Sequence, residues 1–108
     1  PLWLSSPVHE LVVEDGAVRG AVVERQGKLI RVNAKRGVVL ACGGFEANSE
    51  WRTRYLGPGW DLAKVRGTRF NTGDGIRMAL DIGARPFGNW SIRPRLVPLL
   101  SRLQYDHD

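Results

Sequence analysis

Two glycine-containing runs carry the residues best suited to hold a ligand. The first, Gly37–Phe45, is apolar and ends in the pair Gly43-Gly44, and the second, Asn71–Ala79, contains Asp74. Glycine has no Cβ, so the backbone beside it can approach a ligand closely, and the first turn of a helix leaves N–H groups without partners. A strand that ends at a glycine pair, followed by an acidic turn that opens a helix, is typical of a site for a nucleotide cofactor.

Other residue types argue against several other kinds of site. Cys42 is the single cysteine, so an intrachain disulfide is excluded, and a metal site is not expected because the two histidines, His9 and His107, lie far apart. The net charge of +5 comes from arginines and lysines spread along the chain. Dispersed basic residues suit an anionic cofactor or a carboxylate substrate, whereas nucleic acid binding favours a concentrated stripe. No apolar run approaches the roughly 20 residues of a membrane span, and the lone cysteine favours a cytoplasmic location.

The elements that must position the two runs are short. Residues 9–14, 18–25 and 29–33 carry strand-like apolar patterns separated by the turn pairs Asp15-Gly16 and Gln26-Gly27, which predicts a three-stranded meander. Gly37–Ala41 is continuously apolar, as expected for a parallel strand that is covered on both faces.

Two helices are expected after the first run. One begins at Asn48 as its N-cap and ends at Gly57. The other spans residues 75–83, with Ile76, Ala79, Leu80 and Gly83 on one apolar side. In the first helix Trp51, Tyr55 and Leu56 share a side. The leucines of residues 92–103 have helical spacing but two prolines interrupt them, which leaves open a short helix after Pro98 or a displaced tail.

From Pro7 to about Asn89 the chain resembles the flavoprotein subunit family of succinate dehydrogenase and fumarate reductase. The family's Ala-Thr-Gly-Gly-Phe pattern is present as Ala41–Phe45 with Cys42 in place of threonine, and its Thr-Gly-Asp-Gly pattern is intact at Thr72–Gly75. The run Lys64–Gly75 is most similar to the FAD-dependent tricarballylate dehydrogenase branch.

The resemblance implies an α/β fold that looks α+β within this segment. It consists of a β-meander, a buried parallel strand and two helices, as part of a three-layer FAD/NAD(P)-binding domain that leads into a substrate-capping domain. Residues 1–47 would belong to the FAD-binding domain, 48–91 to the junction and the start of the capping domain, and 92–108 to a tail.

The same resemblance implies how the chain would meet FAD. Val8 would lie against the adenine ring, Gly43 and Gly44 would lie near the pyrophosphate and ribityl region, and Asp74 would contact FAD where the second helix starts. The complete set of residues expected to bind the cofactor is Val8, Ala41, Cys42, Gly43, Gly44, Asn71, Thr72, Gly73 and Asp74.

No catalytic residue is expected in this chain. Ser91–Arg95 occupies the place of the family's substrate-side histidine, and the Gly-x-Gly-x-x-Gly turn of dinucleotide-binding folds is absent. We therefore expect an internal segment of an FAD-dependent oxidoreductase whose parent passes a hydride between a di- or tricarboxylate and flavin. The isolated chain should be inactive.

Plainer interpretations stay open beside this one. Gly43-Gly44 is also a good strand-to-helix turn, and Asp74 a helix-start residue. Arg66 and Arg69 could bind a polycarboxylate, since guanidinium groups suit carboxylates, or could belong to a solvated loop. The whole chain could instead be a small basic binding module for nucleic acid or another anionic partner. It could also be an inert remnant that forms a homodimer through an exposed Val38–Ala41 edge.

Overall fold

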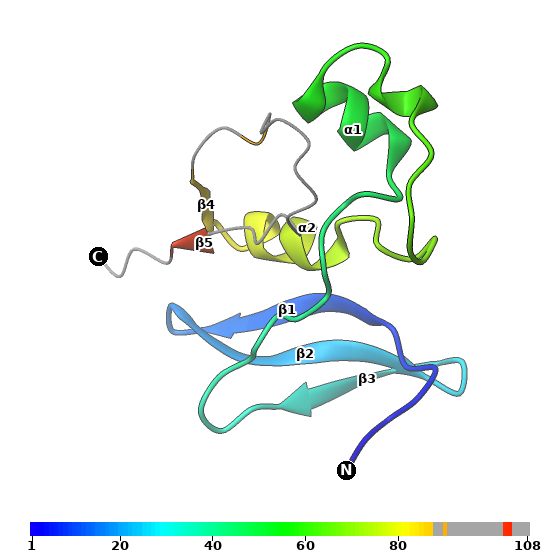
Figure 1. The fold of residues 1–108 in the computed structure, drawn as a ribbon. Helices are drawn as coiled ribbons and strands as arrows, with labels where there is room; N and C mark the ends of the chain where they lie inside the picture. The colour runs from blue at the N-terminus through cyan, green and yellow to red at the C-terminus, as the bar shows by residue number, and fades with distance from the viewer. Residues whose placement is uncertain (88–89, 91–102, 105–108) are drawn as a thin grey trace. The chain divides into compact units, whose positions relative to one another are not determined.

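The computed structural model describes residues 1–87, 90 and 103–104, and it contains two compact units, Pro1–Leu40 and Ala41–Asp108. The first unit is a small sheet and the second contains two α-helices (Figure 1). The alternatives for the leucine-rich stretch at 92–102 and the tail predicted from 92 onward lie almost entirely outside the described residues. Only a short pairing of β4 (Arg85–Pro86) with β5 (Leu103–Gln104) reaches into that region.

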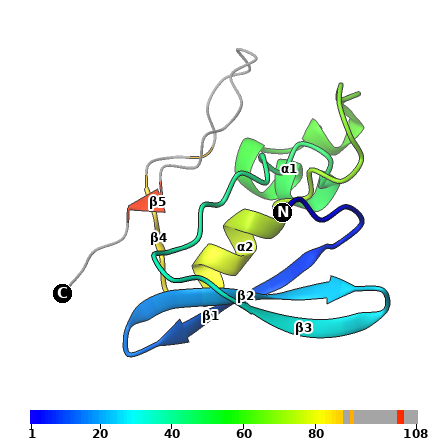
Figure 2. The ribbon, with the colours of Figure 1, turned by 90° about the horizontal axis from the view of Figure 1, so that it is seen from below.

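The first unit is the predicted antiparallel meander. Its strands β1 (Val8–Glu14), β2 (Ala17–Arg25) and β3 (Lys28–Asn33) pair in the order β1-β2-β3 (Figure 2). At both hairpins the two turn residues are left-handed, with φ of 52° and 73° at Asp15-Gly16 and 51° and 74° at Gln26-Gly27. Two consecutive positive φ values are the mark of a type I′ turn, which matches the natural twist of a hairpin.

The interior of the meander lies on β2. Ala21 and Val23 are its buried apolar residues, at 9% and 7% exposure. Gly20, on the same strand, faces Asn33 across the ladder, and a Cβ built there would lie 2.1 Å from the carbonyl oxygen of Val32. Only glycine therefore allows β3 to approach β2 this closely at that point.

The second unit is built around two short helices and an aromatic cluster. Helix α1 (Ser49–Leu56) begins at the predicted N-cap, since the Asn48 side chain accepts a hydrogen bond from the Trp51 N–H at 3.1 Å. A 3₁₀ turn, η1 (Trp60–Leu62), follows it. The Phe45 ring, 3% exposed as a residue, lies 5.7 Å from the ring centres of both Trp51 and Tyr55, and the Tyr55 and Trp90 rings are 4.7 Å apart.

Helix α2 (Asp74–Asp81) confirms the second predicted helix, one residue earlier at its start and two earlier at its end. Its buried side chains include Ile76 and Ala79, as expected from their spacing, and also Met78, which the expected apolar face left out. The buried face is therefore wider than the predicted stripe.

The predicted buried strand over Gly37–Ala41 is wrong for this chain. The five residues pair with no strand among those the structure describes, and Val39 is 91% exposed. A strand requires neighbours that supply ladder hydrogen bonds, and a parallel strand also requires cover on both faces. Apolar composition fits such a strand but cannot create its neighbours.

Candidate functional site

The two glycine runs lie against each other within the second unit. The Gly73 N–H donates to the Gly44 carbonyl oxygen at 3.0 Å, and the Ala47 N–H donates to the Asn71 carbonyl oxygen at 2.9 Å. The first run thus meets the start of α2 directly, although a helix and a long loop separate them in sequence. These two contacts create the candidate site.

Two asparagine side chains strengthen the same junction. Asn48 caps α1 with its side-chain oxygen, and its Nδ2 donates to the Thr72 carbonyl oxygen at 3.0 Å. Asn71 donates from Nδ2 to the Glu46 carboxylate at 2.8 Å. The sequence predicted the cap but neither cross-connection, because helix-capping patterns are local and these partners are remote.

Three glycines lie where the runs approach each other most closely. Gly43 has a φ of 76°, and a Cβ there would lie 3.1 Å from Asn71 Oδ1. Gly73 has a φ of 89°, and its Cβ would lie 2.4 Å from the Trp51 ring. Gly75 faces Cys42, with 3.1 Å between a built Cβ and Cys42 Sγ. A side chain at Gly73 would collide with the Trp51 ring, whereas at Gly43 the Asn71 amide would have to move by a few tenths of an ångström.

Part of this junction faces outward. Ala41, Cys42 and Gly43 are exposed, whereas Gly44 and Gly73 are buried and shape the backbone from within. The backbone N–H groups of residues 41–44 donate no hydrogen bond to any residue that the structure describes. Those of the exposed residues 41–43 are therefore open to a ligand that offers acceptors, such as a phosphate or the edge of a heteroaromatic ring.

Asp74 adds a carboxylate to this outward face. It is the first residue of α2, with Gly73 as N-cap, and its exposed side chain accepts a hydrogen bond from Thr72 Oγ1 at 3.2 Å. A carboxylate there can accept from ligand hydroxyls, while the helix start attracts negative charge. The surface thus offers both donors and acceptors to a ligand that carries phosphates and hydroxyls.

Sequence reasoning missed Arg52, which is buried at 8% exposure. It donates to the carbonyl oxygens of Trp60 at 2.9 Å, Asp61 at 3.0 Å and Ala63 at 3.4 Å, and also to that of Glu46. Its guanidinium therefore ties η1 and the following loop to the turn after Phe45. An arginine in the middle of a helix normally extends into solvent, so nothing local in the sequence distinguishes this one.

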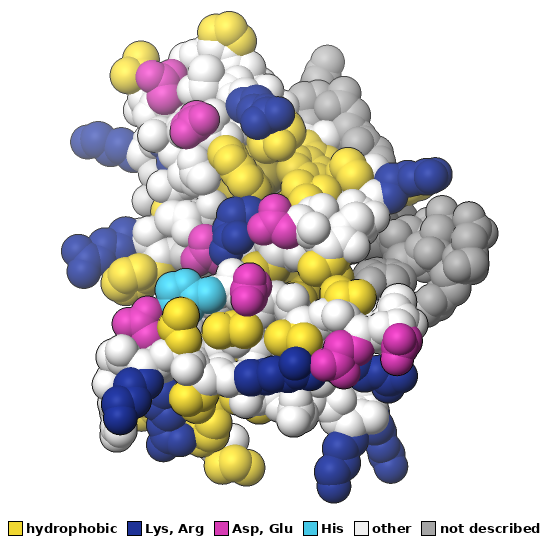
Figure 3. Space-filling model, turned by 180° about the vertical axis from the view of Figure 1, so that it is seen from behind, with side chains coloured by type: hydrophobic (Ala, Val, Ile, Leu, Met, Phe, Trp, Pro, Cys, Tyr) yellow, Lys and Arg dark blue, Asp and Glu magenta, His cyan; other side chains and the backbone are white. Residues whose placement is uncertain are grey.

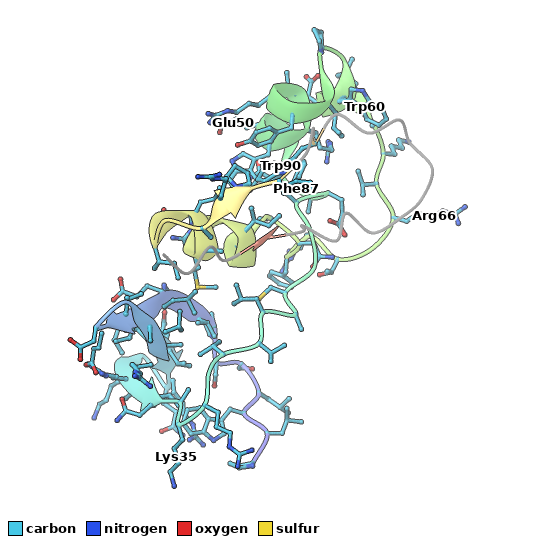
Figure 4. The ribbon with its side chains drawn as sticks, turned by 90° about the vertical axis from the view of Figure 1, so that its left-hand side faces the viewer. Lys35, Glu50, Trp60, Arg66, Phe87 and Trp90 are labelled. Carbon is cyan, nitrogen blue, oxygen red and sulfur yellow. The ribbon has the colours of Figure 1, made fainter. Side chains whose placement is uncertain are left out.

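Val8, Arg66 and Arg69 complete the positions singled out from the sequence. Val8 is the first residue of β1, in the meander, and is 38% exposed; its contact with the cofactor stays a prediction. Arg66 and Arg69 are exposed; Arg66 points away from the helices (Figure 4), and the Arg69 guanidinium lies 5.0 Å from the Phe70 ring centre. Their surroundings match the solvated-loop interpretation.

Surface charge and composition favour no competing kind of site. On the face drawn in Figure 3, basic side chains stand in several separate places with acidic ones between them. Within residues 1–87, 90 and 103–104, no cluster of histidine, cysteine, aspartate or glutamate could hold a metal ion, and no helix is long and apolar enough to cross a membrane. The cytoplasmic location stays a prediction.

The known proteins that this chain resembles include several dehydrogenases. The 3-oxosteroid 1-dehydrogenase of Comamonas testosteroni is 50% identical over 56 residues, which cover 51% of this chain and 10% of that protein. The 4-oxocyclohex-2-ene-1-carboxylate 5-dehydrogenase of Sinomonas cyclohexanicum is 53% identical over 56 residues, covering 51% and 9%. The crystal structure of 3-ketosteroid delta1-dehydrogenase from Sterolibacterium denitrificans, in complex with 1,4-androstadiene-3,17-dione, superposes with a TM-score of 0.75 at 45% identity and covers 80% and 16%.

The chain thus spans between 9% and 16% of the length of these three proteins. They are named for oxosteroids and an oxocyclohexene carboxylate, and not for the tricarballylate that the run Lys64–Gly75 led us to expect. The sequence profile of the FAD binding domain family matches residues 1–100. The chain therefore belongs to this family of FAD binding domains, as its two glycine runs predicted.

Proposed function

We propose that the surface formed by Ala41–Gly44 and Asn71–Asp74 contacts FAD, and that the chain is an internal part of an FAD-dependent dehydrogenase. The observation that carries the proposal is the junction itself. The Gly73–Gly44 hydrogen bond of 3.0 Å joins the runs, while the N–H groups of the exposed residues 41–43 stay available. Family membership identifies the ligand that such a surface would take.

The residues of this surface have different chemical roles. The N–H groups beside Gly43 can donate to phosphate or ring acceptors because no Cβ shields them. The carboxylate of Asp74 can accept from a ribose or ribityl hydroxyl. Gly44 and Gly73 let the two backbones pass closely. The bound cofactor supplies the redox chemistry, since a flavin can take up a hydride; the chain binds and orients it.

For the substrate we favour a ring ketone of the 3-oxosteroid kind. The relatives reported above are named for such compounds. A carbonyl acidifies the neighbouring C–H, so loss of that proton and of a hydride from the next carbon creates a conjugated double bond. A di- or tricarboxylate such as tricarballylate is the competing substrate class, and it is supported only by the resemblance of Lys64–Gly75.

The assignment of residues to domains is part of the same proposal. Residues 1–47 would contribute to the FAD-binding domain and 48–91 to the junction with a capping domain. The catalytic acid and base would come from outside this chain. We therefore expect cofactor contact from the 108 residues, and no turnover.

FAD titration tests the cofactor proposal, and Cys42 provides a built-in probe. This thiol is exposed, is the single cysteine, and lies within the proposed contact surface. The fluorescence of FAD should be quenched when it binds. Bound FAD should also slow the reaction of Cys42 with a thiol reagent at least fivefold, whereas riboflavin should protect the thiol less. Unchanged thiol kinetics at saturating FAD would refute contact at this surface.

Two further measurements distinguish the alternative functions and substrates. Salt-dependent binding to DNA or RNA, with no FAD binding, would favour a basic module.

The substrate is tested with the complete product of the gene. It is incubated with a dye acceptor and either tricarballylate or a 3-oxosteroid that is saturated at C1–C2. Dye reduction with the steroid alone supports the ring-ketone proposal, and reduction with tricarballylate alone overturns it.

A further inference from the structure

The side chain of Asn71 lies between the two glycine runs. A Cβ built on Gly43 would lie 3.1 Å from its Oδ1 and 3.3 Å from both its Cγ and its Nδ2, so the whole amide group rests against the bare α-carbon of that glycine. Its Nδ2 also donates to the Glu46 carboxylate at 2.8 Å. The position of this amide therefore sets how closely the second run approaches Gly43.

Glu46 is itself fixed from both ends. Its carboxylate receives the Asn71 amide, and its carbonyl oxygen receives the buried guanidinium of Arg52. It directly follows Phe45, whose ring is anchored in the aromatic cluster. The Glu46–Asn71 bond is partly buried, which reduces the competition from water.

The carboxylate of Glu46 has a hydrogen-bonding chemistry that suits this position. It only accepts hydrogen bonds, so it selects the donating Nδ2 end of the Asn71 amide, while the amide group lies against Gly43. Hydrogen bonds to an ionised acceptor are also stronger than neutral ones. The residue thus fixes both the place and the orientation of Asn71.

We propose that Glu46 is a positioning residue of the cofactor surface: it holds the Asn71 side chain against Gly43 and so fixes the register of the two runs. The effect on FAD rests on the proposed function above. The coupling of the two runs does not, because it concerns contacts within the chain alone.

Hydrogen exchange in the chain without cofactor tests the coupling. The Ala47 and Gly73 amides, which donate across the junction, should exchange at least tenfold faster in Glu46→Ala. In Glu46→Gln, which keeps an acceptor at the same place, they should stay within threefold of wild type. Glu50→Ala is the matched control, since this exposed glutamate lies on α1 and its side chain points away from that helix (Figure 4).

Unchanged exchange in Glu46→Ala, or equal acceleration in the glutamine and alanine variants, would overturn the proposal. If Glu46→Ala does not fold, Asn71→Ser removes the same bond from the other side and must accelerate the same amides. Amides of the β2–β3 ladder, in the other unit, report any general loss of structure.

FAD titration of the same variants then separates the two proposals. We expect the Kd for FAD to rise at least tenfold in Glu46→Ala and less than threefold in Glu46→Gln, with a changed flavin absorption band in the alanine variant. Faster exchange with an unchanged Kd would overturn the positioning role. A wild-type chain that does not bind FAD would refute the proposed function, and the exchange data alone would then decide on the coupling.

Discussion

The meander and the helical unit are held together in different ways. In the meander, each strand pairs with the next along the chain, and tight turns at Asp15-Gly16 and Gln26-Gly27 connect them. In the helical unit, α1 and α2 are joined by contacts between residues that are remote in sequence. Two of the side-chain bonds, from Asn48 to Thr72 and from Asn71 to Glu46, span 24 and 25 positions.

This difference indicates where each unit is vulnerable. Away from Gly20, the backbone ladder tolerates most substitutions, because every residue other than proline brings the same N–H and C=O groups. A junction made by particular side chains and bare glycines depends on residue identity at each position. Substitutions at the junction should therefore be costly, and comparable substitutions in turns and loops should cost little.

Within the junction, the largest effect should follow Gly73→Ala. Its backbone has a φ of 89°, and the new Cβ would lie 2.4 Å from the Trp51 ring. Left-handed strain and overpacking together should lower the free energy of unfolding by about 3–4 kcal/mol. Gly59→Ala is the matched control, since it shares a φ of 88° but meets nothing within 4 Å.

Urea unfolding followed by tryptophan fluorescence measures both variants. Gly59→Ala should cost only about 1 kcal/mol, the strain alone. The difference between the two variants isolates the packing of Trp51 on Gly73. Equal losses would mean that backbone conformation, and not close approach, makes the junction sensitive.

Arg52→Ala should have the next largest effect. Its buried guanidinium donates to four backbone carbonyls, of which that of Trp60 would keep a second donor, the Ala63 N–H. We expect a loss of about 3 kcal/mol in the free energy of unfolding, because several hydrogen bonds from a buried charged donor are lost together. The exposed Arg66→Ala should change it by less than about 0.5 kcal/mol. A small loss at Arg52 would show that these carbonyls are readily hydrated.

The sequence predicted most of what depends on neighbouring residues. Both hairpin turns, the Asn48 cap and the start of α2 within one residue follow from local rules. The family pattern also predicted that Gly43-Gly44 and Asp74 contribute to the same cofactor site. The physical contact between those runs could not be read from either run alone.

What the sequence did not predict depends on partners elsewhere. Gly37–Ala41 has the composition of a buried strand, but pairing requires a neighbour, which composition cannot supply. Arg52 looks like a surface arginine until the carbonyls of η1 are placed around it. The Glu46–Asn71 bond has no sequence pattern at all.

Asn48 separates local from remote contributions within one residue. Asn48→Ala removes both the cap to Trp51 and the bond to Thr72, and should cost about 2 kcal/mol. Asn48→Asp keeps a capping oxygen and loses only the donor, so it should cost about 1 kcal/mol or less. Urea unfolding gives both values. Equal losses would assign the whole effect to the Thr72 contact, against the capping role.

The smallest effect, and the only stabilising one, is expected in the meander. Gln26 has a φ of 51° at the first position of the second turn, where asparagine is much better tolerated. Gln26→Asn should therefore stabilise the β2–β3 hairpin by about 0.5 kcal/mol. Asp15→Asn is the control at the matching position of the first turn, where φ is 52° and the native residue already tolerates this conformation. Hydrogen exchange of the β2–β3 amides should slow about twofold for Gln26→Asn, and that of the β1–β2 amides should not change for Asp15→Asn. If Gln26→Asn also slowed exchange at the Gly73 amide, the two units would share one unfolding event, and the contrast between ladder and junction would not extend to their stability.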